Sequence, residues 1–317
     1  MFNAAFLTVK EYAIFVIYPV NKLFQRKYNL LLFKFLLLLG FIYIFQDKVM
    51  SYGISYEITH IHYAYLALLV PLIFLNWYFE YVKWRIITHV NELTDARRNQ
   101  SAFFAGILGS FLSPSIVGNF LGRIWYYPSS CRWKISIQSS LANFSQSLVA
   151  ICIGIPFLFS FENKEILAMT SWIITSLFLL AYIFCKELFC ELPWQKIRLM
   201  GENLLSGKIR IQFLILSLIR YMVLVAQYSI ALLLFGADFT LEYFEPIVLV
   251  FLFVTLTPSL FFGKIIVRES IAMTTFSMFT FPLNEVFFAS LLIWILSIFL
   301  PALLALTFLK APKLKFA

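Results

Sequence analysis

The chain has 317 residues, of which 62% are hydrophobic and only 13% are charged, and its mean hydropathy is +0.86. A soluble domain carries roughly 25% charged residues, so the composition excludes a soluble globular protein and predicts an all-α, polytopic membrane helix bundle. The net charge of +9 is better explained by cytoplasmic Lys and Arg beside anionic lipid than by a nucleic-acid surface.

Apolar runs divide the chain into three parts. We expect an interfacial and cytoplasmic segment at 1–28, a single transmembrane domain at 29–309 and a cytoplasmic tail at 310–317. Lys and Arg concentrate in the loops after the second and fourth spans, which predicts that both termini lie in the cytoplasm. The six expected full spans are approximately 29–46, 62–84, 135–160, 166–184, 211–235 and 286–309.

Two further apolar segments, 101–127 and 246–268, are interrupted by proline. In each, a small hydroxyl residue precedes Pro-Ser, and a glycine follows with an arginine five residues later. Proline breaks a helix, and the apolar half before Pro114 is too short to cross a core of about 30 Å. We therefore expect two broken or re-entrant elements. Three spans lie between them, as an inverted-topology repeat would give.

The broken elements predict a receptor for an anion. Freed backbone groups must be buried or line a wet cavity, and Arg matches the oxygens of a phosphate. Arg123 and Arg268 would bind the phosphate, with Lys264 beside them. The alternative is that these cations only anchor helix ends at the interface. The expected breaks of the pathway are Pro114, Gly118, Asn119, Gly122, Pro258 and Gly263.

A second group of charges lies within the spans. Glu80 and Lys83 share one helix face, and Arg220 lies inside an apolar run. We expect Arg220 to pair with Glu80 or with a lipid phosphate, and these three residues to form a supporting network. The alternative for Glu80 and Lys83 is a snorkelling pair within an aromatic belt formed by Trp77 and Trp84.

No motif for enzyme chemistry is present. The sequence has no HExxH, GxSxG or P-loop pattern and no cysteine-based metal set. We therefore expect no catalytic residues, no metal and no cofactor. The expected partners are membrane lipids, with no nucleic acid, and the loop at 185–210 could dock a membrane enzyme.

The order of these motifs resembles the transmembrane region of the lysylphosphatidylglycerol synthase family, which are flippase-like membrane proteins. The resemblance implies an integral plasma (inner) membrane protein that moves or handles a lipid between leaflets. We expect no soluble aminoacyl-transfer domain, because the chain ends soon after its last span. The residues that carry the resemblance are Asn76-Trp77-x2-Glu80-x2-Lys83-Trp84, Ser113 to Arg123, Asn143-x2-Gln146, Thr257-Pro258-Ser259, Val267-Arg268-Glu269, Trp294 and Pro301-Ala302-Leu303.

The sequence departs from this family at Asn119, where a glutamate usually follows the glycine. The leading hypothesis is a lipid translocator that handles an anionic headgroup. The alternative hypothesis is a non-transporting membrane scaffold or regulator of an envelope-lipid or polysaccharide enzyme. A third hypothesis is a membrane-embedded glycolipid-modifying enzyme.

Overall fold

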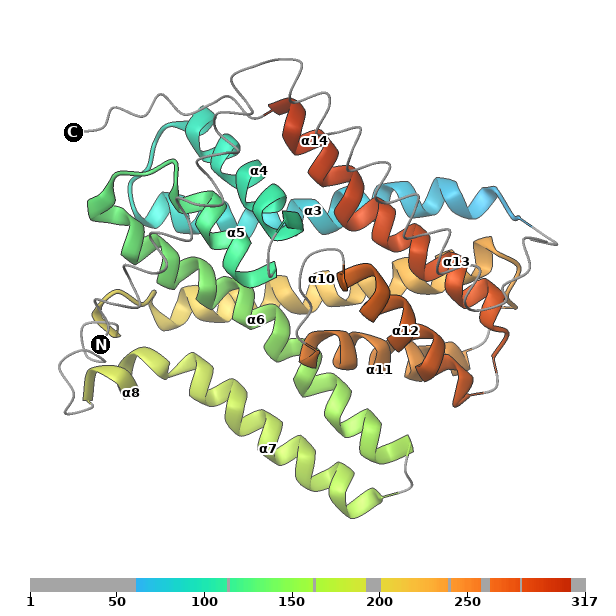
Figure 1. Ribbon diagram of the computed structural model, residues 1–317. Helices are drawn as coiled ribbons and strands as arrows, with labels where there is room; N and C mark the ends of the chain where they lie inside the picture. Colours follow the sequence, from blue (N-terminus) through green and yellow to red (C-terminus); the bar gives the residue numbers. More distant parts are fainter. Residues whose placement is uncertain are drawn as a thin grey trace.

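The computed structural model describes residues 61–112, 115–161, 164–191, 201–238, 241–257, 263–279 and 281–308. Within these ranges the protein is an all-α membrane bundle (Figure 1), which confirms the predicted fold class. The segment 1–28, the expected span at 29–46 and the tail at 310–317 lie outside the described residues. Five described helices are long and apolar enough to cross a membrane: α3 (Ala64–Val90), α6 (Ser129–Phe161), α7 (Glu165–Ile183), α10 (Gly207–Leu234) and the composite helix Leu283–Leu306.

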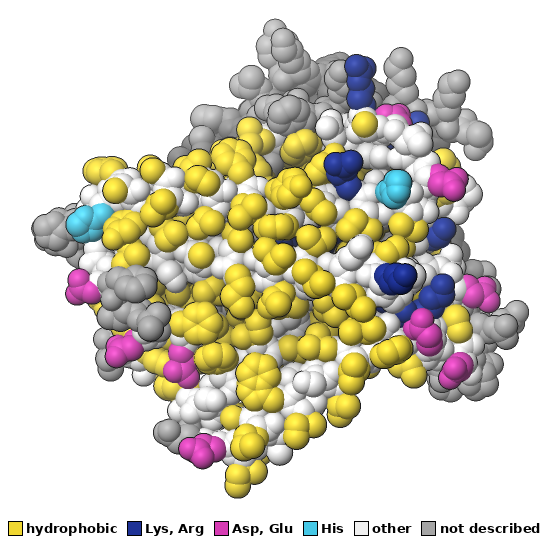
Figure 2. Space-filling view, turned by 180° about the vertical axis from the view of Figure 1, so that it is seen from behind, with side chains coloured by type: hydrophobic (Ala, Val, Ile, Leu, Met, Phe, Trp, Pro, Cys, Tyr) yellow, Lys and Arg dark blue, Asp and Glu magenta, His cyan; other side chains and the backbone are white. Residues whose placement is uncertain are grey.

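The two ends of the bundle carry opposite charge. Figure 2 shows that the acidic side chains at one end of an apolar surface have no Lys or Arg beside them, whereas the other end carries most of the basic side chains together with further acidic ones. The backbone N–H of His62 donates to the carbonyl of Leu234 at 3.0 Å, so α3 begins where α10 ends. We call the end with Glu165, Asp238, Glu242, Glu245 and Glu285 the acidic end. The basic end carries Arg85, Arg97, Arg98, Arg132, Lys134 and Lys208.

The first broken element is a re-entrant hairpin of α4 (Ala96–Leu112) and α5 (Ser115–Ile124). Its two arms return to the basic end, because the Tyr127 hydroxyl, just after α5, donates to the Asn99 side chain at 2.6 Å in the first turn of α4. The predicted re-entrant form is therefore confirmed, while Pro114 itself lies outside the described residues.

The second broken element forms a hairpin from the opposite end. Helices α11 (Phe244–Leu256) and α12 (Gly263–Ser277) both have an end at the acidic end of the bundle. The Phe244 ring lies 5.6 Å from Phe157 near the end of α6, and Phe279, just after α12, lies 4.5 Å from Phe161. Two hairpins thus enter from opposite ends, as the spacing of the motifs predicts. Pro258 lies outside the described residues.

The last span contains a π-helical turn. Helix α13 (Leu283–Trp294) continues through one π-helical turn, η2 (Ile295–Phe299), into α14 (Leu300–Phe308). A short 3-10 turn, η1 (Leu241–Tyr243), precedes α11. The largest apolar core joins side chains of α6, α10, α11, α12 and α13, and a second core joins α3, the first hairpin and the start of α6.

An ion pair fixes the basic end of α10. Arg210 is fully buried and donates to both carboxylate oxygens of Glu187 on α8 (Cys185–Glu191), at 2.8 and 3.1 Å. Most of the loop expected at 185–210 follows α8, and its segment 192–200 lies outside the described residues. The hydrogen bonds from Arg210 hold the pKa of Glu187 below its ordinary value.

We predict a small loss of stability below pH 5 from this pair. Since the pKa of Glu187 is lowered on folding, its contribution is complete above the unfolded pKa of about 4.3 and is lost as pH falls through the lower folded value. The loss is about 1 kcal/mol at most because the carboxylate is half exposed. Thermal unfolding in detergent at neutral and acidic pH measures it. Glu187→Gln should remove this part of the pH dependence, and the exposed-site control Glu191→Gln should retain it.

Candidate anion site within the membrane bundle

Glu80 is the centre of a charged cluster in the interior of the bundle. Its Oε1 accepts a hydrogen bond from Arg123 at 2.9 Å, and its Oε2 accepts one from Arg220 at 2.6 Å. The three residues come from α3, α5 and α10, which lie far apart in the sequence (Figure 1). The predicted pairing of Arg220 with Glu80 is therefore confirmed, and Arg123 joins the same carboxylate.

Aromatic rings hold the Arg123 guanidinium in place. Its Cζ lies 4.9 Å from the ring centroid of Trp84 and 5.4 Å from that of Phe103, and its side chain is 1% exposed. A glycine on α4 leaves room for it, because a Cβ at Gly106 would lie only 2.7 Å from the Arg123 Cγ. Cation–π attraction replaces part of the hydration that the buried guanidinium has lost.

The wall of the site is fixed by hydrogen bonds at the mouth of the first hairpin. The Trp84 indole donates to the backbone carbonyl of Asn99 at 2.9 Å, and the Asn99 amide donates to the carbonyl of Leu93 at 2.7 Å. Burial raises the pKa of Tyr127, so its hydroxyl keeps the proton that it donates to Asn99. Trp84 is fully buried, so it does not belong to an aromatic belt at the membrane interface.

Lys83 is the unusual member of the cluster. Its side chain is 2% exposed, and its ammonium has no hydrogen-bond partner among the described residues. It interacts electrostatically with Glu80, Arg123 and Arg220, but it forms no ion pair with any described carboxylate. The snorkelling pair considered for Glu80 and Lys83 is therefore not formed. Two guanidinium groups share one carboxylate, so the cluster has an excess of positive charge even without Lys83.

Glycines bring the two arms of the first hairpin into backbone contact. A Cβ added at Gly109 would collide with the carbonyl of Gly118, and one added at Gly122 would collide with the carbonyl of Ala105. The predicted close approach at Gly118 and Gly122 thus occurs between α4 and α5. This contact sets the position of Arg123, which directly follows Gly122 near the end of α5.

The second motif does not join this cluster. Arg268 and Glu269 lie on α12, which packs on α11 and α13, and Arg268 interacts electrostatically with Glu269 and Tyr228. Gly263 begins α12, and the side chain of Lys264 lies outside the described part of the chain. The structure therefore places Arg123 with Glu80 and Arg220, and it places Arg268 in another part of the bundle.

Comparison with known proteins gives no family for the chain. It matched no family model, no curated protein and no solved structure. The resemblance to the lysylphosphatidylglycerol synthase family therefore stays a prediction.

Two residues of the site were not part of the network of Glu80, Lys83 and Arg220 that the sequence predicts. The Asn76 side-chain oxygen accepts a hydrogen bond from the Arg220 Nε at 2.7 Å, and Phe103 forms one wall around Arg123. Asn76 precedes Glu80 by four residues, so both lie on one face of α3. That spacing could have identified Asn76. Phe103 gives no comparable signal, because apolar residues surround it in the sequence.

Proposed function

We propose that this protein is a flippase-like lipid translocator that binds an anionic phospholipid headgroup at the Glu80 cluster. One observation carries the proposal: the buried Lys83 ammonium has no partner beside a carboxylate already bound by two arginines. Burying an unpaired cation costs several kcal/mol, so a buried excess of positive charge favours an anionic ligand. A headgroup phosphate would supply the missing charge and several acceptors for hydrogen bonds.

The ligand would arrive from the membrane and not from bulk water. Arg220 lies near the midpoint of α10, about 20 Å along the helix from either end at about 1.5 Å per residue. Its side chain is 22% exposed, which makes it the accessible edge of the cluster. A headgroup would bind Arg220 first and reach Lys83 when the neighbouring helices separate, while its acyl chains remain in the bilayer.

The two opposed hairpins support movement between leaflets. Each enters from one end and turns back within the bundle, so that a shift of either could open the interior to one side. The positive-inside rule would place the basic end on the cytoplasmic side of the membrane, and an inner-membrane location belongs to the same proposal. The sequence has no nucleotide-binding motif, so transport would be passive or coupled to an ion gradient.

Lys83→Met is expected to weaken binding of anionic lipid about tenfold, because it removes a desolvated charge while keeping a side chain of similar length. Native mass spectrometry of the purified protein would measure binding of phosphatidylglycerol against phosphatidylethanolamine. Lys134→Met is the matched control, because Lys134 is exposed at the start of α6. Equal binding by the two variants would contradict the assignment of Lys83.

The variant Asn119→Glu tests the same charge balance by adding a negative charge instead of removing a positive one. Asn119 lies one helical turn before Arg123, and its side-chain oxygen is buried without a partner among the described residues. A glutamate there would supply an internal counter-charge and should also weaken binding of the anionic lipid.

Transport is measured separately by dithionite quenching of labelled phosphatidylglycerol in proteoliposomes. Translocation faster than in empty vesicles, and slowed by both variants, is the expected outcome. If the wild type binds the lipid but moves it no faster than empty vesicles, the translocator proposal is wrong, and the scaffold hypothesis remains.

A further inference from the structure

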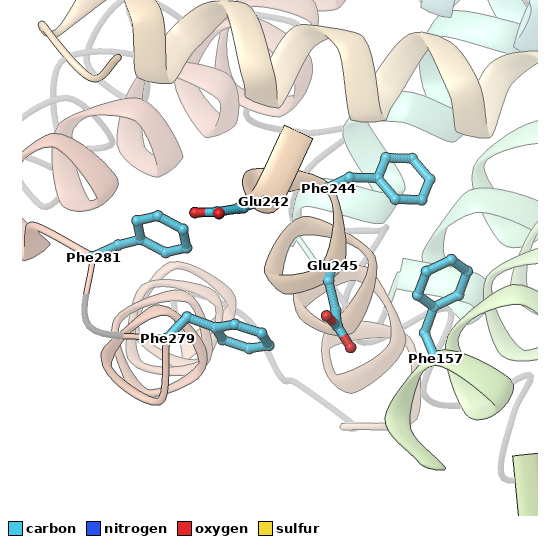
Figure 3. A pocket seen from close by; sticks show the side chains of 6 residues that line it. All are labelled: Phe157, Glu242, Phe244, Glu245, Phe279 and Phe281. Carbon is cyan, nitrogen blue, oxygen red and sulfur yellow. The ribbon is translucent and has the colours of Figure 1, made fainter. Parts of the chain in front are cut away.

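A pocket opens at the acidic end, far from the Glu80 cluster. Its cavity of about 390 Å³ lies between the end of α6, the start of α11 and the segment that joins α12 to α13. Figure 3 shows the Glu242 carboxylate directed toward the ring of Phe281, and the Glu245 carboxylate between the rings of Phe279 and Phe157. The sixth lining residue is Phe244. Four phenyl rings and two carboxylates therefore line one cavity.

The rings are held by contacts with their neighbours. Phe281 packs on Tyr243 with centroids 4.3 Å apart, and Phe279 packs on Phe161 at 4.5 Å. Phe157 and Phe244 meet edge-to-face at 5.6 Å. All four lining rings are only half buried, so part of each remains accessible. An aromatic lining that is already positioned loses little entropy when a ligand binds.

The carboxylates of the pocket have no counter-charge in the described structure. Neither Glu242 nor Glu245 forms an ion pair with any described Lys, Arg or His. Burial raises the pKa of Tyr243, and the nearby carboxylates of Asp238, Glu285 and Glu242 raise it further. These carboxylates make the surroundings of the pocket negative. The local charge is therefore suited to a cation.

We propose that this pocket binds an alkylated ammonium group, such as the trimethylammonium of choline. The faces of phenyl rings attract a cation, and recognition of quaternary ammonium by aromatic rings combines that attraction with apolar contact to the methyl groups. Glu242 and Glu245 supply the opposite charge. The site is independent of the Glu80 cluster, so it does not rest on the proposed translocation.

The lining disfavours other cations. A calcium ion takes six to eight oxygen ligands, whereas the lining side chains offer only two carboxylates among phenyl rings. A primary ammonium has three N–H donors to satisfy, and only the Glu242 and Glu245 carboxylates of the lining could accept them, because the four rings provide no conventional acceptor. A quaternary ammonium has no N–H donor, so the apolar part of the lining leaves none of its groups unsatisfied.

Saturation-transfer difference NMR on the full-length protein in maltoside micelles tests the proposal. The probe is choline, whose N-methyl protons give one sharp signal, and its neutral isostere 3,3-dimethyl-1-butanol is the control ligand. We expect saturation transfer to choline well above that to the alcohol. The double variant Glu242→Gln/Glu245→Gln should reduce it about fivefold or more, and Phe279→Leu should reduce it less, because one ring of four is lost.

Glu165→Gln is the matched control variant, since Glu165 lies at the same end in the first turn of α7 but does not line the pocket. It should bind choline as the wild type does. A second arm uses a short-chain phosphatidylcholine in place of choline. Binding of choline indicates a soluble ligand, and binding only of the phosphocholine lipid indicates a headgroup.

Three outcomes would overturn the proposal. These are clear and equal saturation transfer to choline and the alcohol, undiminished transfer in a folded double variant, and absence of both choline and phosphocholine binding. Elution of each variant as one symmetric peak on size exclusion establishes that it is folded, and Phe279→Leu provides a second test that leaves both carboxylates unchanged.

Discussion

Replacing Glu80 by glutamine is expected to cost about 3 kcal/mol or more of stability, because it leaves the buried Arg123 and the partly buried Arg220 without their shared carboxylate. Removing one partner from a buried ion pair leaves an uncompensated charge in a medium of low polarity. Here two guanidinium groups and the neighbouring Lys83 ammonium would remain together. The expected observation is a large fall in the midpoint of thermal unfolding in detergent, with loss of monodisperse protein during purification.

Two comparisons make the Glu80 result specific. Glu191→Gln removes an exposed carboxylate from α8 and should leave the midpoint almost unchanged. The double variant Glu80→Gln/Arg220→Gln should be more stable than Glu80→Gln alone, because it also removes one of the stranded cations. If Glu80→Gln unfolds at the same temperature as the Glu191 control, Glu80 does not hold these helices together.

Replacing Gly122 by alanine is expected to destabilise the first hairpin by about 1–3 kcal/mol, because the added methyl group overlaps the backbone of α4 at Ala105. A backbone carbonyl cannot rotate away as a long side chain can, so α4 and α5 must separate. That separation would displace the neighbouring Arg123 from Glu80. We therefore expect Gly122→Ala to lower both the unfolding midpoint and the binding of anionic lipid.

Gly207→Ala is the matched control for the glycine effect. A Cβ at Gly207 would have its nearest neighbour at 3.7 Å, which is ordinary van der Waals contact. Both variants add one methyl group, so a difference between them measures the close helix contact and not the loss of a glycine. Equal midpoints and equal lipid binding for the two variants would contradict the close contact between α4 and α5.

The sequence by itself determined the long apolar helices and the two broken elements of the described chain. The length of an apolar run decides whether a helix crosses the bilayer, and a proline interrupts it, because both effects act within a single segment. The re-entrant form of the segment 101–127 could be predicted because the apolar stretch before Pro114 has only about twelve residues, which are too few to cross the membrane. The glycines of α5 were likewise recognisable from their spacing of four residues.

Only the tertiary structure decided which charges meet. Glu80 could have paired with Lys83 one turn away, but its carboxylate is taken by Arg123 and Arg220 from distant helices. Arg123 and Arg268 share a sequence pattern, yet only Arg123 reaches this carboxylate. Helix formation depends on neighbours along the chain, whereas the partner of a buried ion depends on how helices pack. The glycine contacts of α4 and α5 and the rings of Trp84 and Phe103 fix that packing for Arg123.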